Sequence, residues 1–176
     1  MIIGVTALAR AGKDTFADYL VSKYGFPKLN MSDVIAEELV RRGMEPTKDN
    51  RSLLGDEWRK QYGMDIVIRK TLEKAQSYDN VIITGVRSVE EVDFLRKNSK
   101  RFCLVALVAD LDVRFARRDN LDPETLEGFT ARDERDVKNK GLGKVIEMAD
   151  YTLTNNYKTT EDFYRDIDVL MHKIKN

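Results

Sequence analysis

The sequence predicts an α/β fold in which helices cover both faces of a parallel sheet. Short apolar runs alternate with longer amphipathic ones along all 176 residues, an order that is typical of βαβ units. Two of the short runs, 81–83 and 102–108, are continuously apolar, as expected of strands that are buried on both faces. An A-x-x-x-x-G-K motif lies between the first apolar run and the first amphipathic one. The sequence therefore predicts a phosphate-binding turn between the first strand and the first helix.

Composition limits the classes of function. The length suits one domain, 1–176, with a core of its own. Lys and Arg number 30, as do Asp and Glu, and a net charge of zero argues against bulk attraction to nucleic acid polymers or anionic membranes. Cys103 is the single cysteine, which favours a reducing, cytoplasmic setting. The N-terminus has no basic leader, and no apolar run has membrane-spanning length. We expect a cytoplasmic monomer or homodimer without a membrane partner.

Five runs are predicted as strands: 1–6, 27–31, 80–84, 102–108 and 151–154. Amphipathic helices fill the gaps between them. In the helix predicted over 13–24, Phe16, Leu20 and Tyr24 recur at four-residue intervals and mark one apolar face. The stretch 32–78 is long enough for three short helices. We interpret it as a helical insertion over the C-terminal edge of the sheet, where open α/β sheets bind ligands.

Two further helices follow the third strand and the last one. Ser88 and Glu91 have the spacing of a capping box, in which each side chain satisfies an orphan backbone N–H. The helix that they open is expected to bury Val89, Val92 and Leu95. The C-terminal helix carries an apolar stripe with the helical period, formed by Phe163, Ile167, Leu170, Met171 and Ile174.

The loop that starts at Ala7 has the features of a phosphate site. Gly12 lets the backbone approach phosphate oxygens, and the N–H groups that open the next helix point at the anion. Lys13 would place a cation against the β- and γ-phosphates of ATP. The alternative is an ordinary βα turn with a solvated lysine. The residues expected to bind the nucleotide are Ala7, Leu8, Ala9, Arg10, Ala11, Gly12, Lys13, Asp14 and Thr15.

One residue of the motif is unusual. Ser or Thr normally follows the lysine and ligates Mg²⁺, but here Asp14 does, and Thr15 comes one place late. A carboxylate can hold Mg²⁺ directly or through water, because this ion takes oxygen ligands and keeps several waters. We therefore expect Asp14, and Thr15 unless it only caps the turn, to assist the metal.

"GKDT" directly after an N-terminal strand is similar to deoxynucleoside monophosphate kinases and phosphomevalonate kinases of the P-loop class. Four further segments, in order, are "NMSDVIAEEL", "RSLLGDEWRKQYGMDIVIRK", "IITGVRSVEEVDFLRK" and "RDERDVKNKGLGKVIEMADYTLTNN". Together they resemble an archaeal family of small P-loop kinases related to dephospho-CoA kinases and adenylate kinases. The resemblance spans nearly the whole chain. It implies a three-layer α/β/α P-loop NTP hydrolase fold, a five-stranded parallel sheet of order 2-3-1-4-5, and a mobile lid over about 117–143.

Asp33 and Arg59 are candidates for binding the acceptor. Ser32 and Asp33 lie where a strand meets a helix; either caps the helix, or Asp33 contacts the acceptor's sugar or base, as its place in similar kinases implies. Arg59 on the insertion could clamp an acceptor phosphate with two parallel hydrogen bonds. The alternative is an ion pair with Asp56 or Glu57. The neighbouring Trp58 is expected to pack in the core.

Arg87 is the stronger acceptor candidate. It follows a buried strand and a glycine turn and stands immediately before the helix cap. This order places a cation at the C-terminal edge of the sheet, next to the phosphate loop if the first and third strands are neighbours. We expect Arg87 to bind a substrate phosphate; the alternative is a structural ion pair.

Arginines gather in the predicted lid. Arg114, Arg117 and Arg118 are expected on a helix after the fourth strand, and Arg132 and Arg135 share a helix face by their i, i+3 spacing. In similar kinases a lid brings arginines over the transferring phosphoryl group and excludes water. The resemblance therefore implies a catalytic role for Arg118, Arg132 and Arg135. With Lys13 of the loop and Arg87, which lie outside the lid, they form the expected catalytic set. The alternative is a solvated charged face.

Two other positions bear on the resemblance. Where this chain has Thr84, similar kinases carry an Asp, which would contact Mg²⁺ or act as a base. In this chain Asp14 would take over some of that role. The segment that ends in Asn155 is similar to the last strand and turn of dephospho-CoA kinases, where backbone groups frame the adenine. Asn155 is also a turn residue by type. His172 has no Cys or His partner in the pattern and is expected to be structural.

The sequence as a whole predicts an ATP- and Mg²⁺-dependent phosphotransferase. The acceptor would be a small nucleotide-like molecule: a nucleoside monophosphate, a deoxynucleoside monophosphate or dephospho-CoA. A nucleotide-binding switch that acts on a protein partner is the alternative, and Thr84 gives it weight. A P-loop fold without activity is the third possibility.

Overall fold

Strands and helices alternate along the chain as predicted. The computed structural model describes residues 1–120 and 122–175, so residue 121 of the predicted lid and residue 176 of the predicted domain lie outside the described residues. The strands are β1 (Ile2–Ala7), β2 (Lys28–Asn30), β3 (Val81–Thr84), β4 (Phe102–Val108) and β5 (Tyr151–Thr154). The helices of the described part are α1 (Lys13–Tyr24), α2 (Met31–Arg41), α3 (Lys48–Tyr62), α4 (Ile66–Ala75), α5 (Val89–Asn98), α6 (Leu111–Ala116), α7 (Leu126–Lys140), α8 (Leu142–Glu147) and α9 (Thr160–Lys175). Each predicted strand lies within one residue of its expected bounds.

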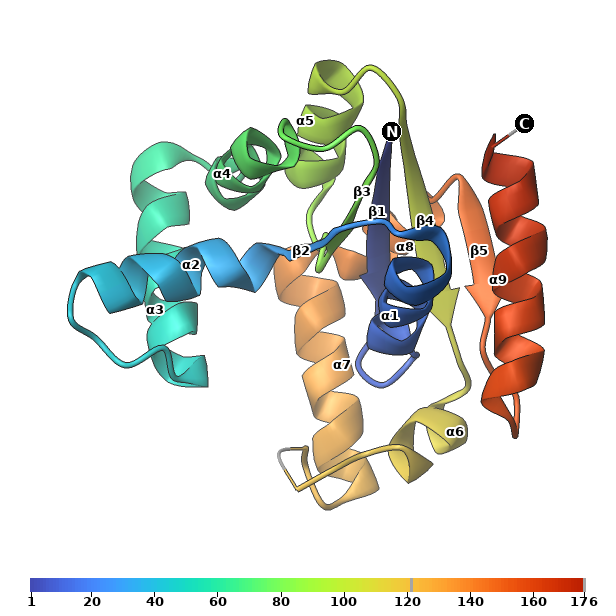
Figure 1. Cartoon of the computed structure of the whole chain (residues 1–176). Coiled ribbons are helices and arrows are strands. Elements are labelled where there is room, and N and C mark those ends of the chain that lie inside the picture. The colour runs from blue at the N-terminus through green and yellow to red at the C-terminus, as the bar shows by residue number, and fades with distance from the viewer. Residues whose placement is uncertain (121, 176) are drawn as a thin grey trace.

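The five strands form one parallel sheet of order β2-β3-β1-β4-β5 (Figure 1). The predicted α/β fold and the strand order 2-3-1-4-5 are confirmed. β1 lies at the centre, between β3 and β4, in a register that pairs Val5 with Thr84 and Val105. The carboxyl ends of all five strands therefore meet at one edge, as parallel pairing requires.

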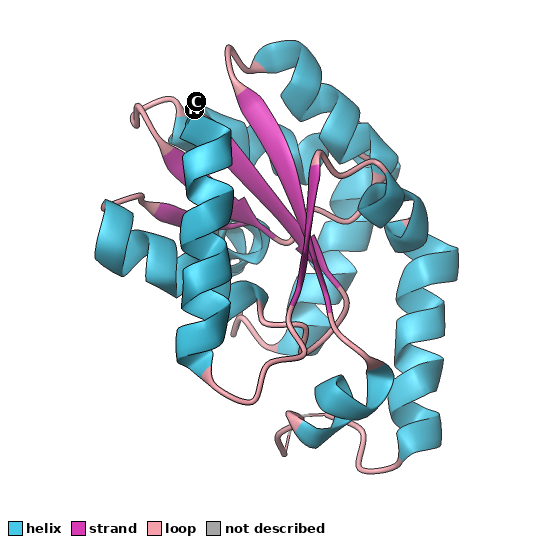
Figure 2. Ribbon diagram, turned by 90° about the vertical axis from the view of Figure 1, so that its right-hand side faces the viewer, coloured by secondary structure: helices cyan, strands magenta, loops and turns pink. Residues whose placement is uncertain are grey.

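Helices cover both faces of the sheet (Figure 2). α1 and α9 pack on one face and bury Phe16, Leu20, Ile167 and Met171 against it. α4, α5 and α8 pack on the other face. The apolar stripe predicted for the C-terminal helix is buried in full, and Val92 and Leu95 of α5 are fully buried beneath the predicted capping box. Tyr24 and Val89, expected in the core, are half-buried at its margin.

The insertion folds into the three predicted helices, α2, α3 and α4, which extend to one side of the sheet (Figure 1). Trp58 packs in its core at 4% exposure, as expected. The helix cap differs from the prediction. Asn30, rather than Ser32 or Asp33, is the N-cap of α2, and its side chain accepts a hydrogen bond from the Ser32 N–H at 3.1 Å. Asn30 is also the last residue of β2, so the same residue ends the strand and caps the helix.

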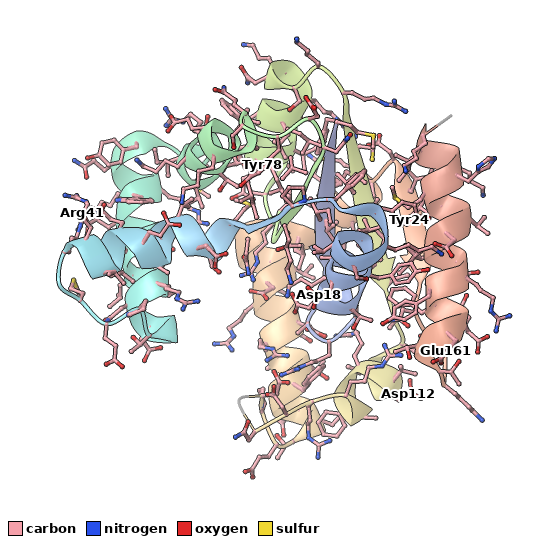
Figure 3. The ribbon with its side chains drawn as sticks, viewed as in Figure 1. Asp18, Tyr24, Arg41, Tyr78, Asp112 and Glu161 are labelled. Atoms are coloured by element: carbon pink, nitrogen blue, oxygen red, sulfur yellow. The ribbon has the colours of Figure 1, made fainter. Side chains whose placement is uncertain are left out.

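A tyrosine cluster joins α1 to α9. The rings of Tyr19 and Tyr164 stack with centroids 4.1 Å apart. Tyr24 points from α1 toward α9 (Figure 3), where its hydroxyl donates to Asp168 at 2.8 Å. These contacts fix the two helices that cover one face of the sheet. In the part of the chain that the structure describes, no helix is long and apolar enough to cross a bilayer.

Leu20→Ala is expected to destabilise the fold by about 3 kcal/mol, because it removes a fully buried side chain from the core beneath α1. The matched control is Val21→Ala, one residue on and 41% exposed, which should change stability by no more than about 0.5 kcal/mol. Urea unfolding measures both. Equal losses in the two variants would contradict this description of the core.

Candidate active site

One cavity lies where the carboxyl end of β1 meets α7. Its volume is about 530 Å³, within the range of roughly 300–1,000 Å³ that is usual for small-molecule sites. The residues that line it come from the loop after β1, the turn after β3, the end of α6 and α7: Ala7, Leu8, Ala9, Arg10, Gly12, Lys13, Asp14, Thr15, Arg87, Arg117 and Asp136. The phosphate loop and Arg87 therefore face the same space.

Sheet pairing explains why these segments meet. β1 and β3 are neighbours, and beyond the ladder the Gly85 N–H still donates to the Val5 carbonyl at 3.2 Å. Gly85 has φ of +92°, a conformation that costs glycine little, and the chain turns there toward the loop after β1. The condition on which the expected position of Arg87 depended, the adjacency of the first and third strands, is met.

The loop before α1 is shaped for an anion. Gly12 is the N-cap of α1 with φ of 101°, and no side chain caps the helix there. The N–H groups of the first turn are thus left for a ligand. A Cβ atom at Gly12 would lie 2.2 Å from Asn155 Nδ2. Arg10, which precedes it in the loop, also has a positive φ, of 63°, a conformation that is uncommon for a non-glycine residue.

Asn155 supports this loop from the far end of the chain. It is buried directly after β5, and its Nδ2 donates to the Ala11 carbonyl at 3.0 Å. Its own carbonyl accepts from Arg117 Nη1 at 2.9 Å. Asn155 thus lies beside the phosphate loop, a contact that the sequence did not predict. Its expected contribution to an adenine site stays a prediction.

Lys13 and Asp14 bind each other in this structure. Lys13 Nζ donates to Asp14 Oδ2 at 2.6 Å, and Lys28 Nζ lies 3.6 Å from the other carboxylate oxygen. Burial opposes the charge on Asp14, but the hydrogen bond from Lys13 and the two ammonium charges outweigh it and lower the pKa of the carboxyl. The Asp14 carboxylate is therefore charged near neutral pH. A triphosphate would compete with Asp14 for the ammonium.

The residues present fit Mg²⁺ held largely by a nucleotide. Within the described residues no group of three or more His, Cys, Asp or Glu could hold a metal, so a closed protein cage is not formed there. Mg²⁺ in phosphoryl-transfer sites commonly takes one or two carboxylates together with phosphates and waters. Asp14, Thr15 and Asp136 bring such oxygens to the cavity. β3, with the sequence VIIT, brings no acid to the cavity, and its last residue, Thr84, has a buried Oγ1 without a hydrogen-bond partner.

The acceptor candidates are placed differently from one another. Arg87 is exposed and lines the cavity. Arg59 does not line it: Nη1 lies 3.7 Å from Asp56 and Nη2 lies 3.8 Å from Glu91. Of the two pairs that the sequence suggested for Arg59, the one with Asp56 is present, whereas Glu57 lies 3.5 Å from Arg42. Asp33 is exposed in the first turn of α2 and lies outside the cavity lining.

The three lid arginines of the expected catalytic set, Arg118, Arg132 and Arg135, do not line the cavity. α6 ends at Ala116, so Arg117 and Arg118 follow the helix instead of lying on it. Arg118 stacks on the Phe115 ring, 4.0 Å from its centroid. Arg132 pairs with Asp122 and packs over Phe129, and Arg135 is exposed on α7.

Two residues that the sequence did not single out for the site, Arg117 and Asp136, line the cavity instead. Charge gave no signal that separated them from their neighbours, since arginines and acids alternate throughout this region. Catalytic roles for Arg118, Arg132 and Arg135 stay predictions that would require a movement of the lid.

Ion pairs join the phosphate loop to the predicted lid. Arg10 Nε donates to Asp122 at 2.5 Å, and Arg132 pairs with the other oxygen of the same carboxylate. Burial opposes the charge on Asp122, but hydrogen bonds from Arg132, the Asp119 N–H and Arg10 lower its pKa to about 2. Arg114, itself buried, donates to the Ala9 carbonyl at 3.2 Å and to Asp133 of α7 at 2.5 Å.

Comparisons with known proteins agree with this geometry. The family described as AAA domain matches residues 8–136. A UPF0200 protein of Methanosarcina mazei is 32% identical over 99% of this chain and 96% of its own length. One from Thermoplasma volcanium is 37% identical over 93% of this chain and 92% of its own. The chain belongs to the UPF0200 family and carries the AAA domain.

Solved structures show the same fold for this UPF0200 chain. A shikimate kinase from Bacteroides thetaiotaomicron superposes with a TM-score of 0.68 at 16% identity, over 100% of this chain and 99% of that one. Shikimate kinase from Acinetobacter baumannii, in complex with shikimate, has a TM-score of 0.59 at 21% identity and covers 98% and 92%. The fold is that of P-loop kinases.

Gly12→Ala is expected to weaken ATP binding more than about tenfold, because the new Cβ would displace Asn155 and the loop carbonyl that it holds. Gly25→Ala is the matched control: φ there is also positive, at +68°, but nothing lies within 4 Å of a built Cβ. That variant should lose about 1–2 kcal/mol of stability and keep its ATP affinity. Calorimetric titration with ATP compares them, and equal affinities would contradict the steric argument.

Asp122→Asn is expected to cost about 2 kcal/mol near neutral pH, because the carboxyl pKa of about 2 lies below its unfolded value of about 4. A lowered pKa gives stability that is present above the unfolded pKa and lost as the pH falls toward the folded one. The difference from wild type should therefore shrink between about pH 4 and pH 2. Asp112→Asn, exposed on α6 (Figure 3), is the control. Urea unfolding across this pH range measures it; a pH-independent difference would count against the ion pairs.

Proposed function

We propose that this protein is an ATP- and Mg²⁺-dependent phosphotransferase that moves the γ-phosphoryl group to a small nucleotide-like acceptor. Nucleoside monophosphates, deoxynucleoside monophosphates and dephospho-CoA are the acceptors considered. The observation that carries the proposal is the cavity shared by Lys13 and Arg87. One of these cations belongs to a phosphate loop, and the other comes from the neighbouring strand of the sheet. Phosphoryl transfer needs two such groups, because donor and acceptor must be held in line.

The donor would be bound by the loop after β1. Backbone N–H groups of residues 10–15 and the ammonium of Lys13 would surround the β- and γ-phosphates. Lys13 would leave its hydrogen bond with Asp14 for a phosphate oxygen, and the freed carboxylate would become available to the metal. When bound, Mg²⁺ neutralises charge that develops on the phosphates; Asp14, Thr15 and Asp136 are the residues at hand to hold it. The Asp14 that replaces the usual hydroxyl thus has a role in both states.

The acceptor would bind on the side of Arg87. Its guanidinium can hold two phosphate oxygens in parallel, which a lysine cannot do. Arg59 and Asp33 lie on the insertion, at the edge of this region, and would contact an acceptor that extends beyond the cavity. Arg87 and Arg117 bring positive charge to the cavity beside Lys13, whereas Arg10, which also lines it, is already paired with Asp119 and Asp122. Cations from three segments suit two anionic ligands in one space.

The solved relatives in fold support a small-molecule acceptor. Two of them are shikimate kinases, and one of these is in complex with shikimate. Their identity to this chain is low, so the acceptor itself does not carry over. A closer relation to dephospho-CoA kinases or adenylate kinases, which the sequence segments suggested, is part of the proposal.

A nucleotide-binding switch is the second candidate, and Thr84 favours it. The hydroxyl of Thr84 is buried and unpartnered at the end of β3, where similar kinases carry an acid. Without that acid a P-loop protein could hydrolyse ATP slowly and act through a conformational change on a protein partner. Such a protein would release ADP at a rate that no small acceptor alters.

ADP release with ATP and Mg²⁺ is expected to rise when the right acceptor is added from a panel of nucleoside monophosphates, deoxynucleoside monophosphates and dephospho-CoA. Lys13→Ala should abolish this rise, a loss of at least about a hundredfold, because it removes a cation from the transferring phosphate. Lys173→Ala, exposed on α9, is the charge-matched control and should behave as wild type. Slow release that is indifferent to every acceptor would favour the switch, and ATP binding without turnover would leave a fold that has lost activity.

A further inference from the structure

A buried carboxylate joins the two arginines proposed to face the acceptor. Glu91 of α5 is 1% exposed. Its Oε2 accepts from the backbone N–H of Arg87 at 2.8 Å and of Ser88 at 3.2 Å. Its Oε1 lies 3.8 Å from Arg59 Nη2, on the insertion. Segments that are far apart in the sequence thus converge on one side chain.

The helix cap alone does not require this charge. Ser88 and Glu91 form a capping box, and Gln serves as well as Glu in that motif. An ionised carboxylate at such depth is costly unless it is paired. Burial raises the pKa of Glu91, and the N–H groups of Arg87 and Ser88 with the charge of Arg59 oppose that rise. A Glu is therefore favoured over a Gln at this position because its charge can pair with the guanidinium of Arg59.

A glycine on α3 makes room for the Arg59 side chain on its way to Glu91. Gly55 lies one turn earlier, and a Cβ there would be 3.1 Å from Arg59 Nη1 and 3.2 Å from Ile35 Cδ1. The missing side chain leaves the room that the guanidinium occupies across the helix. The 3.8 Å contact with Glu91 is longer than a hydrogen bond. Arg59 is thus oriented by charge while its N–H donors remain available to a ligand.

We infer that Glu91 is a positioning residue that sets Arg59 and Arg87 as one binding unit for the phosphate of a phosphorylated acceptor. It fixes Arg87 through the backbone and draws Arg59 from the insertion toward the same edge of the sheet. The inference rests on the proposed function and narrows it to acceptors with a terminal phosphate, which the nucleoside and deoxynucleoside monophosphates have and dephospho-CoA, whose phosphates form an internal diphosphate, does not. Since Glu91 is buried, it acts on the acceptor through the two arginines and does not touch it.

Glu91→Gln tests this, because it keeps the cap and removes the charge. With the acceptor found in the panel, KM for the acceptor should rise roughly tenfold while kcat and the KM for ATP stay within about twofold. Glu90→Gln, an exposed neighbour on the same helix, is the matched control and should leave all three constants unchanged. Arg59→Ala combined with Glu91→Gln should be no worse than Arg59→Ala alone, because both act through one interaction. An unchanged acceptor KM in Glu91→Gln, or effects that add in the double variant, would overturn the inference.

A second readout separates this inference from the proposed function. If the wild-type protein shows no acceptor-dependent turnover, the proposed function fails, and NMR of the Arg59 Nε–Hε group still decides the positioning role. The wild-type signal should be that of a restrained side chain, and in Glu91→Gln it should become that of a mobile, solvated arginine. An identical signal in both proteins would refute the role of Glu91 whatever the turnover.

Discussion

The parallel pairing of β3 with β1 is the constraint on which the candidate site depends. It brings the carboxyl ends of two strands together although about 80 residues separate them. The hydrogen bond from Gly85 to Val5 continues the pairing past the ladder and places the turn that carries Arg87 beside the phosphate loop. With a helix or another strand between β1 and β3, the same two motifs would face different spaces and no donor and acceptor could meet.

Local patterns explain what the sequence could predict. Short apolar runs, two of them continuous, predicted the strands; the A-x-x-x-x-G-K motif located the loop; and the spacing of Ser88 and Glu91 predicted the helix cap. The lid residues that face the cavity were harder to predict, because many charged residues in this segment share the same helical spacing. Contacts with Phe115, Asp122 and Phe129 turn its expected arginines away from the cavity, and such tertiary contacts leave no trace in periodicity. Arg117 and Asp136 face the cavity for the same reason, through the placement of α6 and α7.

The phosphate loop and α7 behave as one unit in this structure. Arg114 holds the Ala9 carbonyl and Asp133 together, while Arg10 reaches Asp122 from the loop itself. A lid that moved freely would have to break buried, charged contacts, each of them expensive to leave unpaired. The lid and the loop are therefore expected to respond together when a nucleotide enters. This coupling also gives the uncommon Arg10 backbone conformation a structural reason, because this conformation directs the side chain toward the lid.

Asn155 ties the beginning of the chain to its end. Ala11 lies in the loop after β1, yet the side-chain amide that donates to its carbonyl lies 144 positions further along the chain. Contacts so distant form slowly, since a long segment must be ordered before they gain anything. The shape of the phosphate loop therefore depends on β5, which carries the chain to Asn155. A truncated chain without β5 and Asn155 would keep the A-x-x-x-x-G-K motif but lose the contact that holds the Ala11 carbonyl.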